Sequence, residues 1–433
     1  MERILALAQK VAAEAEVYQV SSEETQVRFE ANRLKQLQTN QSTSVALRII
    51  KDGRIGYATT SGALDRRQLV KNAVETAFFG AIAKFRLPGR TSYPEIEILD
   101  PAVASVPIKG MVGLGEAMID TITAHTPGII CEGGASRGTV SLKIINSRGG
   151  QAEYRKSYFS LGIEGTLVEG TDMLFVGESD SSCHPITDPA LIIKTVLRQL
   201  DLARNKAKAP TRKLPVIFTP DGATALLMPL MSAFNGKTVL EGASPIGDKV
   251  DKLVFDKKFS LSDDPTIAFR PGSRPCDDEG VASRRNHLIQ NGIVKGFLYD
   301  LQTAALAGTE STGNGSRGRG GLPAPSPSAF VIAPGDTTFE DMVQDIKEGL
   351  VIEQLMGAEQ GNILGGDFSG NVLLGYKVEN GKMVGRVKDT MVAGNVYQIL
   401  KDIAAIGSEA KWVGGFLQAP PLYCKGLSVS SKG

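Results

Sequence analysis

Histidine, the side chain that most often binds transition metals and moves protons near neutral pH, is scarce in this chain. Only three of the 433 residues are histidines, and none has a second histidine within reach along a helix. This scarcity argues against a histidine-based metal site and against histidine-driven acid–base chemistry. The three residues are His125, His184 and His287. We expect the first and the last at the surface or at helix caps, and His184 in a loop.

Cysteine is nearly as sparse, and its spacing indicates no cross-linked framework. The four cysteines are scattered without a CxxC pair, which argues against a zinc knuckle and against a set of disulfides. Buried free thiols in a reducing cytoplasm are the simplest interpretation. Cys276 lies beside three acids, which should raise its pKa, the wrong direction for a nucleophile. Cys183 and His184 are adjacent in sequence, but adjacency does not bring two side chains together, so no catalytic pair is predicted.

Long apolar runs and an excess of one charge are also missing. No stretch approaches the roughly 20 apolar residues of a membrane span, and the first residues lead into an amphipathic helix rather than a signal-peptide core. We therefore expect a cytoplasmic protein without a membrane partner. The formal net charge is +1 and aromatic content is 6%, which does not favour direct contact with nucleic acid. Charged content of 22% and hydrophobic content of 42% are ordinary for a globular protein.

The first half of the chain alternates amphipathic helices with strands that are joined by turn signals. This pattern predicts an α+β domain over residues 1–210, an N-terminal antiparallel sheet with helices on one face. A proline and three basic residues at 207–214 mark the predicted boundary. Helices are expected over 1–15, 65–82, 107–125 and 189–206. Strands are expected over 16–20, 25–31, 34–39, 44–50, 56–60, 129–134, 139–146 and 152–169.

The second half, residues 211–433, has short strands punctuated by glycine and few helices, which predicts a β-rich, barrel-like domain. Asn291-Gly292 between apolar residues predicts a hairpin, because both turn residues must take positive φ. A helix is expected from an N-cap at Asp221 to residue 234, kinked at Pro229. Residues 308–321 are rich in glycine, serine and threonine and carry Arg317 and Arg319. Their composition is typical of an exposed or ligand-ordered loop.

An acidic run stands just before the predicted hairpin. Asp277, Asp278 and Glu279 could serve as an acid–base pair or as cation ligands. Adjacent strand residues point to opposite faces, so at most two of them can share a pocket. The preferred interpretation is structural: these residues would cap the hairpin or pair with Arg284 or Arg285.

Two glycine-containing stretches have both a functional and a structural interpretation. Residues 313–318 (GNGSRG) match the dinucleotide-binding string GxGxxG, but no strand precedes them and no helix follows, so a nucleotide fold is not predicted. As a nest of backbone N–H groups with two arginines, the stretch could hold a carboxylate or phosphate, and a surface loop is the preferred alternative. Residues 412–416 (WVGGF) could form a binding ledge or part of the core, and the core is preferred.

Several strings, in this order and spacing, resemble the TldD/PmbA family over essentially the whole chain. They are residues 30–34 (EANRL), 52–58 (DGRIGYA), 276–280 (CDDEG), 291–292 (NG), 311–314 (STGN), 363–370 (ILGGDFSG), 387–390 (VKDT) and 394–395 (GN). The resemblance implies a two-subunit peptidase. Its TldD-type subunits carry an HExxxH motif on a helix of the C-terminal domain, where two histidines bind zinc and the glutamate acts as general base. Its PmbA-type subunits, also called TldE, lack the motif.

For this chain the resemblance implies the PmbA/TldE type. Where HExxxH would stand, the chain has Met228, Pro229 and Ala233, and none of them is a zinc ligand or a base. No catalytic residue and no metal are therefore expected here, and zinc is expected in a TldD partner. The functional cysteine that TldD has near its C-terminus is also missing, because that region reads 412–415 (WVGG) and Cys424 follows about ten residues later.

The mechanism that the resemblance implies is a supporting one. The subunit would form a closed chamber with a TldD-type catalytic subunit, or a homodimer when alone, and would admit unfolded or short peptides. Asp278, Arg317, Arg319 and Asp367 would line or rim this chamber. Family roles include maturing a peptide antibiotic that targets gyrase and turning over an antitoxin. Two alternatives stay open, a stand-alone hydrolase that uses carboxylates such as Asp278, and a binding protein that modulates gyrase.

Overall fold

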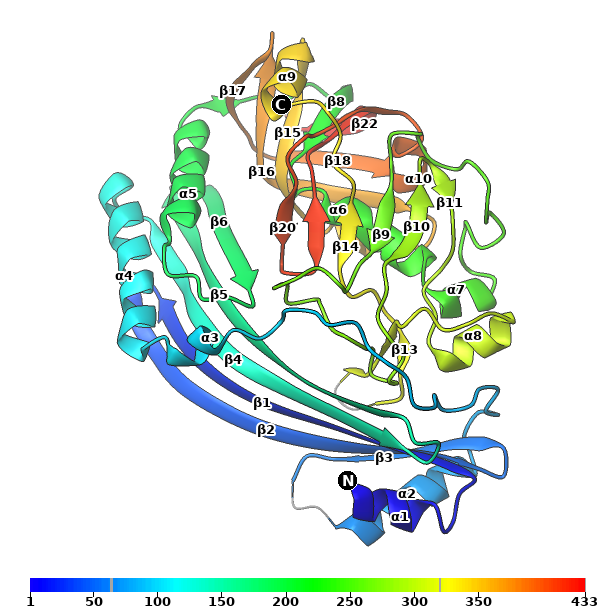
Figure 1. Ribbon diagram of the computed structural model, residues 1–433. Coiled ribbons are helices and arrows are strands. Elements are labelled where there is room, and N and C mark those ends of the chain that lie inside the picture. The colour runs from blue at the N-terminus through cyan, green and yellow to red at the C-terminus, as the bar shows by residue number, and fades with distance from the viewer. Residues whose placement is uncertain (63–64, 319–320, 433) are drawn as a thin grey trace.

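The computed structural model describes residues 1–62, 65–318 and 321–432 and confirms the predicted α+β class (Figure 1). A long, curved N-terminal sheet wraps around a β-rich C-terminal unit. The sheet has the order β3-β2-β1-β4-β5-β6, and every neighbouring pair is antiparallel. Its strands are β1 (Glu14–Glu30), β2 (Arg33–Lys51), β3 (Arg54–Thr60), β4 (Ile130–Asn146), β5 (Gln151–Glu169) and β6 (Asp172–Ser182).

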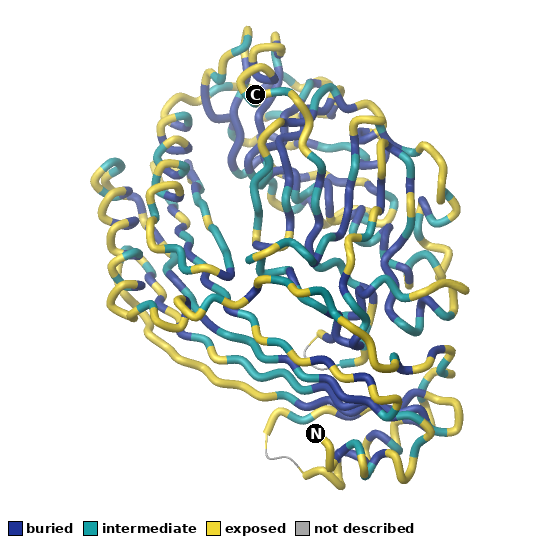
Figure 2. Tube along the Cα trace, in the orientation of Figure 1, coloured by how far each residue is buried: buried dark blue, intermediate teal, exposed yellow. Residues whose placement is uncertain are grey.

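The first two strands are far longer than predicted. The two strands predicted over 16–20 and 25–31 are one strand, β1, and the two predicted over 34–39 and 44–50 are one strand, β2; they are 17 and 19 residues long. Their middle segments lack hydrophobic alternation, so the sequence pattern breaks there. Contacts between side chains of the paired strands stabilise these segments instead, as in the 2.8 Å hydrogen bond between the hydroxyls of Ser22 and Ser42. Figure 2 shows the outer part of β2 as an exposed stretch, in agreement with its burial pattern.

The N-terminal helices lie on one face of this sheet, as predicted. Val17 of β1 packs under the first two helices, and Val27 and Phe29 of the same strand pack under the later ones. These odd-numbered residues share one face because side chains alternate along a strand, and Tyr18 on the opposite face contacts the C-terminal unit. The helices are α1 (Glu2–Ala8), α2 (Arg66–Ala77), α3 (Pro101–Ser105), α4 (Ile108–His125) and α5 (Ala190–Ala203).

Helix boundaries agree with the prediction where a capping residue is present, and they differ from it where the sheet competes for the same residues. Asp65 caps α2 as predicted, accepting hydrogen bonds from two backbone N–H groups. The first helix, however, ends at Ala8 instead of residue 15. The backbone N–H of Ala13 donates to Ile50, so the sheet takes over these residues. None of the helices in the described part of the chain combines the length and apolar character that crossing a bilayer requires.

The C-terminal unit contains the predicted barrel-like arrangement. Strands run β15-β8-β22-β18-β16, and an additional pairing of β15 with β16 closes this ring. A parallel pair joins β7 to β17, so the sheet takes its first strand from residues 206–207. The strands of this sheet are β7 (Lys206–Ala207), β8 (Arg212–Phe218), β15 (Glu348–Met356), β16 (Asp367–Glu379), β17 (Lys382–Val387), β18 (Thr390–Asn395), β19 (Ile403–Ile406) and β22 (Leu422–Ser431).

A second sheet and short helices complete this unit. The sheet has the order β11-β10-β9-β14-β21-β20. Its strands are β9 (Leu261–Asp263), β10 (Asn286–Gln290), β11 (Ile293–Val294), β14 (Phe330–Ile332), β20 (Lys411–Val413) and β21 (Leu417–Ala419), with β12 (Gly315–Ser316) and β13 (Ala324–Pro325) as a separate pair. The helices are α6 (Thr224–Ala233), α7 (Gly236–Leu240), α8 (Leu301–Ala307), α9 (Phe339–Asp345), α10 (Val396–Ile399) and the 3₁₀ turn η2 (Ala358–Gln360).

The N-terminal sheet and the C-terminal unit share buried surface. One apolar cluster joins Ile192 and Val196 of α5 to Val351 of β15 and Tyr376 of β16. A second places Cys276 against Tyr18 and its neighbours on the sheet. The concave face of the sheet is therefore held against the C-terminal unit, and any site between them is built from both halves of the chain.

The Asn291-Gly292 hairpin gives a first testable prediction. Both residues have positive φ, 48° and 78°, as the sequence predicted. A Cβ on residue 292 would also collide with the carbonyl oxygens of Phe255 and Asp256. We expect Gly292→Ala to lower the free energy of unfolding by about 2–4 kcal/mol, since the clash adds to the roughly 1–2 kcal/mol conformational cost.

Gly53 provides the matched control for this substitution. It occupies the equivalent place in the Asp52-Gly53 hairpin with φ 74°, and a Cβ there would meet nothing within 4 Å. We expect Gly53→Ala to show only the conformational cost, roughly 1–2 kcal/mol. Urea denaturation of both variants is the measurement, and equal losses would contradict the clash at residue 292.

Candidate functional site

Two cavities adjoin at the edge of the N-terminal sheet, and together they form what we term the inter-domain cleft. The larger, about 630 Å³, lies between α5, strand β6, the loop around residues 219–221 and strand β20. The smaller, about 340 Å³, lies against β1, β4 and β5. Glu178, Ser179 and Asp221 line both cavities. Because β6 is the last strand of its sheet, the cleft opens along a strand edge.

A lysine between two carboxylates stands where the cavities meet. Lys411 Nζ bonds to Glu178 Oε2 and lies 3.4 Å from Asp221 Oδ2. The Glu178 side chain is 8% exposed, and burial raises its pKa against the opposing effect of Lys411. Burial would lower the pKa of Lys411, but Asp221 and Glu178 outweigh it and the net direction is upward. The ammonium therefore stays charged beside two acceptors.

Trp412, the only tryptophan in the chain, lines the larger cavity and is half-buried. The Cζ atom of Arg270 lies 5.0 Å from the centroid of its ring, a cation–π arrangement that fixes the indole. The preferred prediction of a core position is thus wrong, because β20 is an edge strand and presents this side chain to the cleft. Exposed Leu191 and half-buried Phe339 and Met383 provide further apolar wall.

A buried carboxylate fixes the position of α5 across the cleft. Glu353 of β15 accepts hydrogen bonds from Arg198 Nη2 at 2.6 Å and from Gln199 Nε2 at 2.8 Å. The Gln199 amide also exchanges hydrogen bonds with the backbone of Gly177 in β6. Helix, edge strand and barrel are therefore tied together by polar contacts, which makes this wall of the cleft rigid.

The structure brings two of the four predicted chamber residues together. The backbone N–H of Arg317 donates to Asp278 Oδ2 at 2.7 Å, and its Nε donates to the Asp278 carbonyl at 3.1 Å. Both residues are buried between the sheet and the C-terminal unit. Asp367 is exposed at the start of β16, where Asn395 Nδ2 donates to it at 2.8 Å. Arg319 lies outside the described residues. A role in lining a chamber stays a prediction for all four.

The glycine-rich loop is more buried than its composition predicted. Asn314, Gly315 and Arg317 are buried, because the acidic run accepts from Gly315 and Arg317 and because Asp263 accepts from Asn314. Asp277 Oδ2 accepts the backbone N–H of Gly315 at 2.8 Å, beside the bond between Arg317 and Asp278. The prediction of an exposed loop over 308–321 is therefore wrong in this segment. A loop of small residues can be buried when carboxylates satisfy its N–H groups.

The acidic run has a structural role, as preferred, but with other partners than expected. Asp277 Oδ1 accepts the backbone N–H groups of Glu279 and Val281, both at 2.9 Å. Burial, reinforced by the charge of Glu279, raises the pKa of Asp277 to about 7. Glu279 pairs with Arg48 of β2 at 2.5 Å. Arg284 instead donates to the Ser311 carbonyl and Arg285 lies near Asp264, so pairing with these two arginines is not found.

Helix α6 does not fit a zinc site. Met228 is 47% exposed, whereas Pro229 and Ala233 are buried, so these positions do not share one open face. Their thioether, ring and methyl groups offer no nitrogen or oxygen donor. Among the described residues, no three His, Cys, Asp or Glu side chains gather as a metal-binding group. Asp221 is also not the N-cap that the sequence predicted, since α6 begins at Thr224 and the Asp221 carboxylate turns to Lys411.

The histidines and cysteines lie outside the cleft chemistry. His184 Nδ1 is 2.7 Å from Asp100 Oδ2, and its ring stacks on Phe269. All four cysteines are buried and free, as predicted. The pKa of Cys276 is raised to about 12, chiefly by burial and then by Asp277, which confirms the predicted direction.

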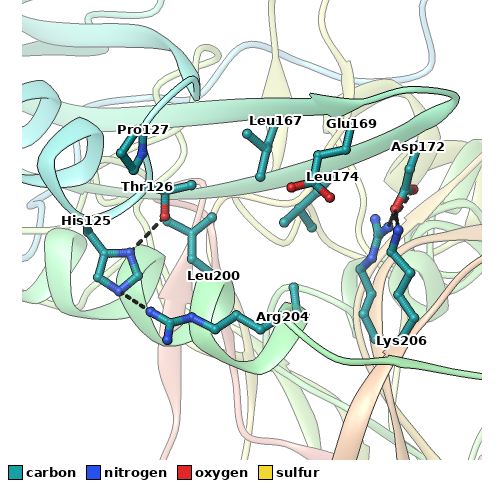
Figure 3. A pocket seen from close by; sticks show the side chains of 12 residues that line it. His125, Thr126, Pro127, Leu167, Glu169, Asp172, Leu174, Leu200, Arg204 and Lys206 are labelled. Atoms are coloured by element: carbon teal, nitrogen blue, oxygen red, sulfur yellow. Dashed lines mark hydrogen bonds and ion pairs between the residues drawn. The ribbon is translucent and has the colours of Figure 1, made fainter.

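A third cavity of about 390 Å³ lies beside α4 and α5 and is lined by His125 (Figure 3), whereas His287 of β10 is exposed, as predicted. His125 contacts Thr126 Oγ1 at 2.8 Å and Arg204 Nη2 at 3.2 Å. On the opposite side, Asp172 is held by Arg386 at 2.5 Å and by Lys206 at 2.5 Å. The single carboxylate cancels only one of these positive charges, but its bonds to Lys206 of β7 and Arg386 of β17 join β6 to the C-terminal sheet, which gives the arrangement a structural role.

Sequence reasoning missed most of the cleft. Its residues Glu178, Arg198, Glu353 and Lys411 come from distant segments, and none stands in a local pattern that indicates a site. The one available signal was the single tryptophan beside two glycines at 412–415, and its functional interpretation was not the preferred one.

Comparisons with known proteins indicate one protein family. A family model described as PmbA/TldA metallopeptidase C-terminal domain matches residues 211–431, and one described as PmbA/TldA metallopeptidase domain 1 matches residues 15–78. The uncharacterized protein MJ0231 of Methanocaldococcus jannaschii is 29% identical, covering 99% of this chain and 100% of that protein. A metalloprotease PmbA homolog of Haemophilus influenzae is 26% identical, covering 93% and 89%. TldE from Thermococcus kodakarensis has the same fold, with a TM-score of 0.91, 23% identity and 100% cover of both chains.

Proposed function

Because the chain belongs to the PmbA/TldD metallopeptidase family, we propose that it is a non-catalytic, TldE-type subunit that presents peptides to a zinc-bearing, TldD-type partner. The observation that carries this proposal is α6, where Met228, Pro229 and Ala233 leave the family's metal position without donors. The cleft is lined by residues 219–221, which precede this helix, and by none of the helix's own residues, and it has the size and lining of a ligand site. A subunit with a cleft but no metal ligands is suited to binding rather than to hydrolysis.

Peptide is the ligand that the cleft favours. The cleft runs along β6, where the backbone N–H groups of Gly177, Ser179 and Ser181 already donate to side chains, so an extended peptide would be held there by side chains of the cleft and not by strand addition. Trp412 and the apolar wall beside it would take one side chain. Lys411 would orient a peptide carbonyl, and Glu178 and Asp221 would accept from peptide N–H groups or an amino terminus. Zinc held by the partner would supply the hydrolytic chemistry, and the residues of this chain would bind and orient the peptide.

Reconstitution with a TldD-type subunit from the same source tests the proposal. We expect this chain alone to release no product from a mixture of short peptides and to contain no stoichiometric zinc by elemental analysis. Addition of the partner should give cleavage at least tenfold faster than the partner alone, because two subunits would complete the site. Trp412→Ala in this chain should reduce that gain about tenfold by raising KM, since one aromatic contact is worth about 1–2 kcal/mol.

Met228→Ala serves as the control for this experiment, because its side chain is exposed and offers no ligand in the proposed mechanism. It should leave the rate of the reconstituted pair unchanged. Zinc bound at one equivalent to this chain, or peptide cleavage by this chain alone, would overturn the proposal.

The geometry of the site does not favour the two alternative functions, a carboxylate-dependent hydrolase and a binding protein that modulates gyrase. Asp278 is buried and already accepts from the Arg317 N–H, with the Tyr18 hydroxyl at 3.4 Å, so its carboxylate is engaged within the protein. A carboxylate-dependent hydrolase built on Asp278 is therefore not favoured. No described feature favours binding to gyrase.

A further inference from the structure

The side chain of Arg274 is buried and makes no hydrogen bond to the described part of the chain. Arg274 lies between the concave face of the sheet and the C-terminal unit, and its side chain is 12% exposed. Its Nε is buried without a partner among the described residues, and its nearest carboxylate oxygen, Asp278 Oδ1, is 4.0 Å away. Asp278 cannot close this gap freely, because Tyr18 and Arg317 already donate to it. A buried guanidinium without acceptors is costly, so the fold retains a group whose partner is missing.

The pocket around this guanidinium is rich in further donors. Its volume is about 290 Å³, and we term it the Arg274 pocket. Ser328 Oγ is also buried, with no hydrogen-bond partner in residues 1–62, 65–318 and 321–432. Lys156 Nζ uses two of its three N–H groups on the carbonyls of Pro271 and Ser273, at 2.5 and 3.3 Å. The phenol of Tyr154 lines the same space. Donors in such excess over acceptors select a ligand that brings acceptor oxygens.

Neighbouring acids do not meet this demand. Asp263 Oδ1 accepts the backbone N–H groups of Ser328 and Ala329, and its Oδ2 accepts from Asn314. Asp277 is likewise saturated by backbone N–H groups. These carboxylates act on Arg274 only through their charge, and they disfavour a ligand that carries two negative charges.

The other residues that line the pocket are apolar, and they indicate which ligand group lies beside the acceptor oxygens. Val20 and Leu142 of the sheet and Pro271 and Pro327 of the C-terminal unit line the pocket. A carboxylate with an aliphatic side chain beside it fits this division, and the volume suits one terminal residue of a peptide. Arg270 lines the inter-domain cleft and the next residue, Pro271, lines the Arg274 pocket, so the two sites are neighbours along the chain.

We propose that the Arg274 pocket binds a carboxylate, and that this carboxylate is the free C-terminus of a peptide lying in the inter-domain cleft. The choice of a peptide rests on the proposed function, whereas recognition of a carboxylate rests on the pocket alone. Arg274 would hold both carboxylate oxygens as a fork, with Ser328 and Lys156 as additional donors. The subunit would thus select chain ends over internal segments of protein.

A pair of peptides tests this proposal on the full-length chain. A six-residue peptide that ends in leucine is compared as free acid and as C-terminal amide by isothermal titration calorimetry. We expect the acid to bind about 10–100-fold more tightly, in line with hydrogen bonds to a charged group. Arg274→Met should remove this preference. Arg284→Met removes one positive charge from a site that does not line the pocket and should leave the preference intact.

The melting temperatures of the Arg274 variants show whether each variant folds. Arg274→Met removes the positive charge that faces Asp278 at 4.0 Å, so its melting temperature should fall, whereas Arg274→Lys keeps the charge, loses only the guanidinium fork and should stay folded. Arg274→Lys should still weaken the preference for the acid peptide, and an unchanged preference in this folded variant would overturn the proposal.

The outcomes separate this inference from the proposed function. Equal affinity of the acid and amide peptides would overturn the carboxylate pocket and leave peptide binding intact. If neither peptide binds, N-acetyl-leucine and its amide are tested as probes by thermal shift. Stabilisation by the acid alone would support a carboxylate pocket and contradict a peptide cleft, and no effect from either would remove both.

Discussion

Replacement of Glu16 by alanine is expected to lower the free energy of unfolding by about 3–5 kcal/mol. Glu16 is fully buried on β1 and accepts from Arg48 Nη2 at 3.0 Å and from Arg317. Arg48 also bonds to Glu279. Four charged side chains from four distant segments thus form one network between the sheet and the C-terminal unit. Removal of Glu16 leaves Arg317 without its carboxylate and Arg48 with one partner in place of two.

Urea denaturation followed by circular dichroism measures this loss, with Glu153→Ala as the control. Glu153 lies on β5 of the same sheet and pairs with Lys143 at 3.3 Å, but both side chains are exposed. We expect the control to change stability by less than about 1 kcal/mol, because water screens exposed pairs. Losses of similar size in the two variants would show that the buried network does not hold the two parts together.

Asp172→Asn is expected to lower the free energy of unfolding by about 3 kcal/mol at neutral pH, because it leaves buried Arg386 without a counter-charge. Asp172 accepts from Arg386 at 2.5 Å and lies 2.5 Å from Lys206 (Figure 3). Burial alone would raise the pKa of Asp172, but the bonds from Lys206 and Arg386 outweigh it and hold the pKa well below its usual range. The pair fastens the end of β6 to β17, beside the cleft.

The same substitution has a defined pH dependence. The stabilisation from ionised Asp172 is fully present above its unfolded pKa, about 3.9, and is lost as pH falls through the lower folded pKa. Asparagine resembles the protonated carboxyl, so the gap between the natural chain and the variant should narrow below about pH 4. Glu348→Gln, which breaks a more exposed pair with Arg212, should cost less than about 1 kcal/mol. A gap that stays constant from pH 7 to pH 3 would contradict this account.

The two buried ion-pair networks, around Glu16 and around Asp172, could not be predicted from patterns along the chain. Asp278 and Arg317 were singled out from composition and do meet, but their surroundings were not foreseen. Their neighbours Glu16 and Arg48 are ordinary charged residues on alternating strands. The sequence does not distinguish a charged residue that becomes buried from one that stays solvated, because the local pattern is the same for both.

Local signals performed well where the cause of a structure is itself local. Asn291-Gly292 forms its hairpin because few other residue pairs accept two positive φ angles, and Asp65 caps α2 because its carboxylate reaches N–H groups two and three residues on. They failed at residues 9–15 and at Asp221, where a strand partner and Lys411 respectively outcompete the helix. Trp412 was misplaced for a related reason, since only the sheet order makes β20 an edge.

The sequence by itself determined the class of fold, the family and the absence of metal ligands on α6, because these depend on periodicity, on ordered motifs and on which atoms a side chain contains. Tertiary structure alone decided the cleft at β6, the buried network around Glu16 and the unpaired Arg274. Each of these depends on distances between residues far apart in the chain, and burial gives a charge its energetic weight only after the fold has brought those residues together.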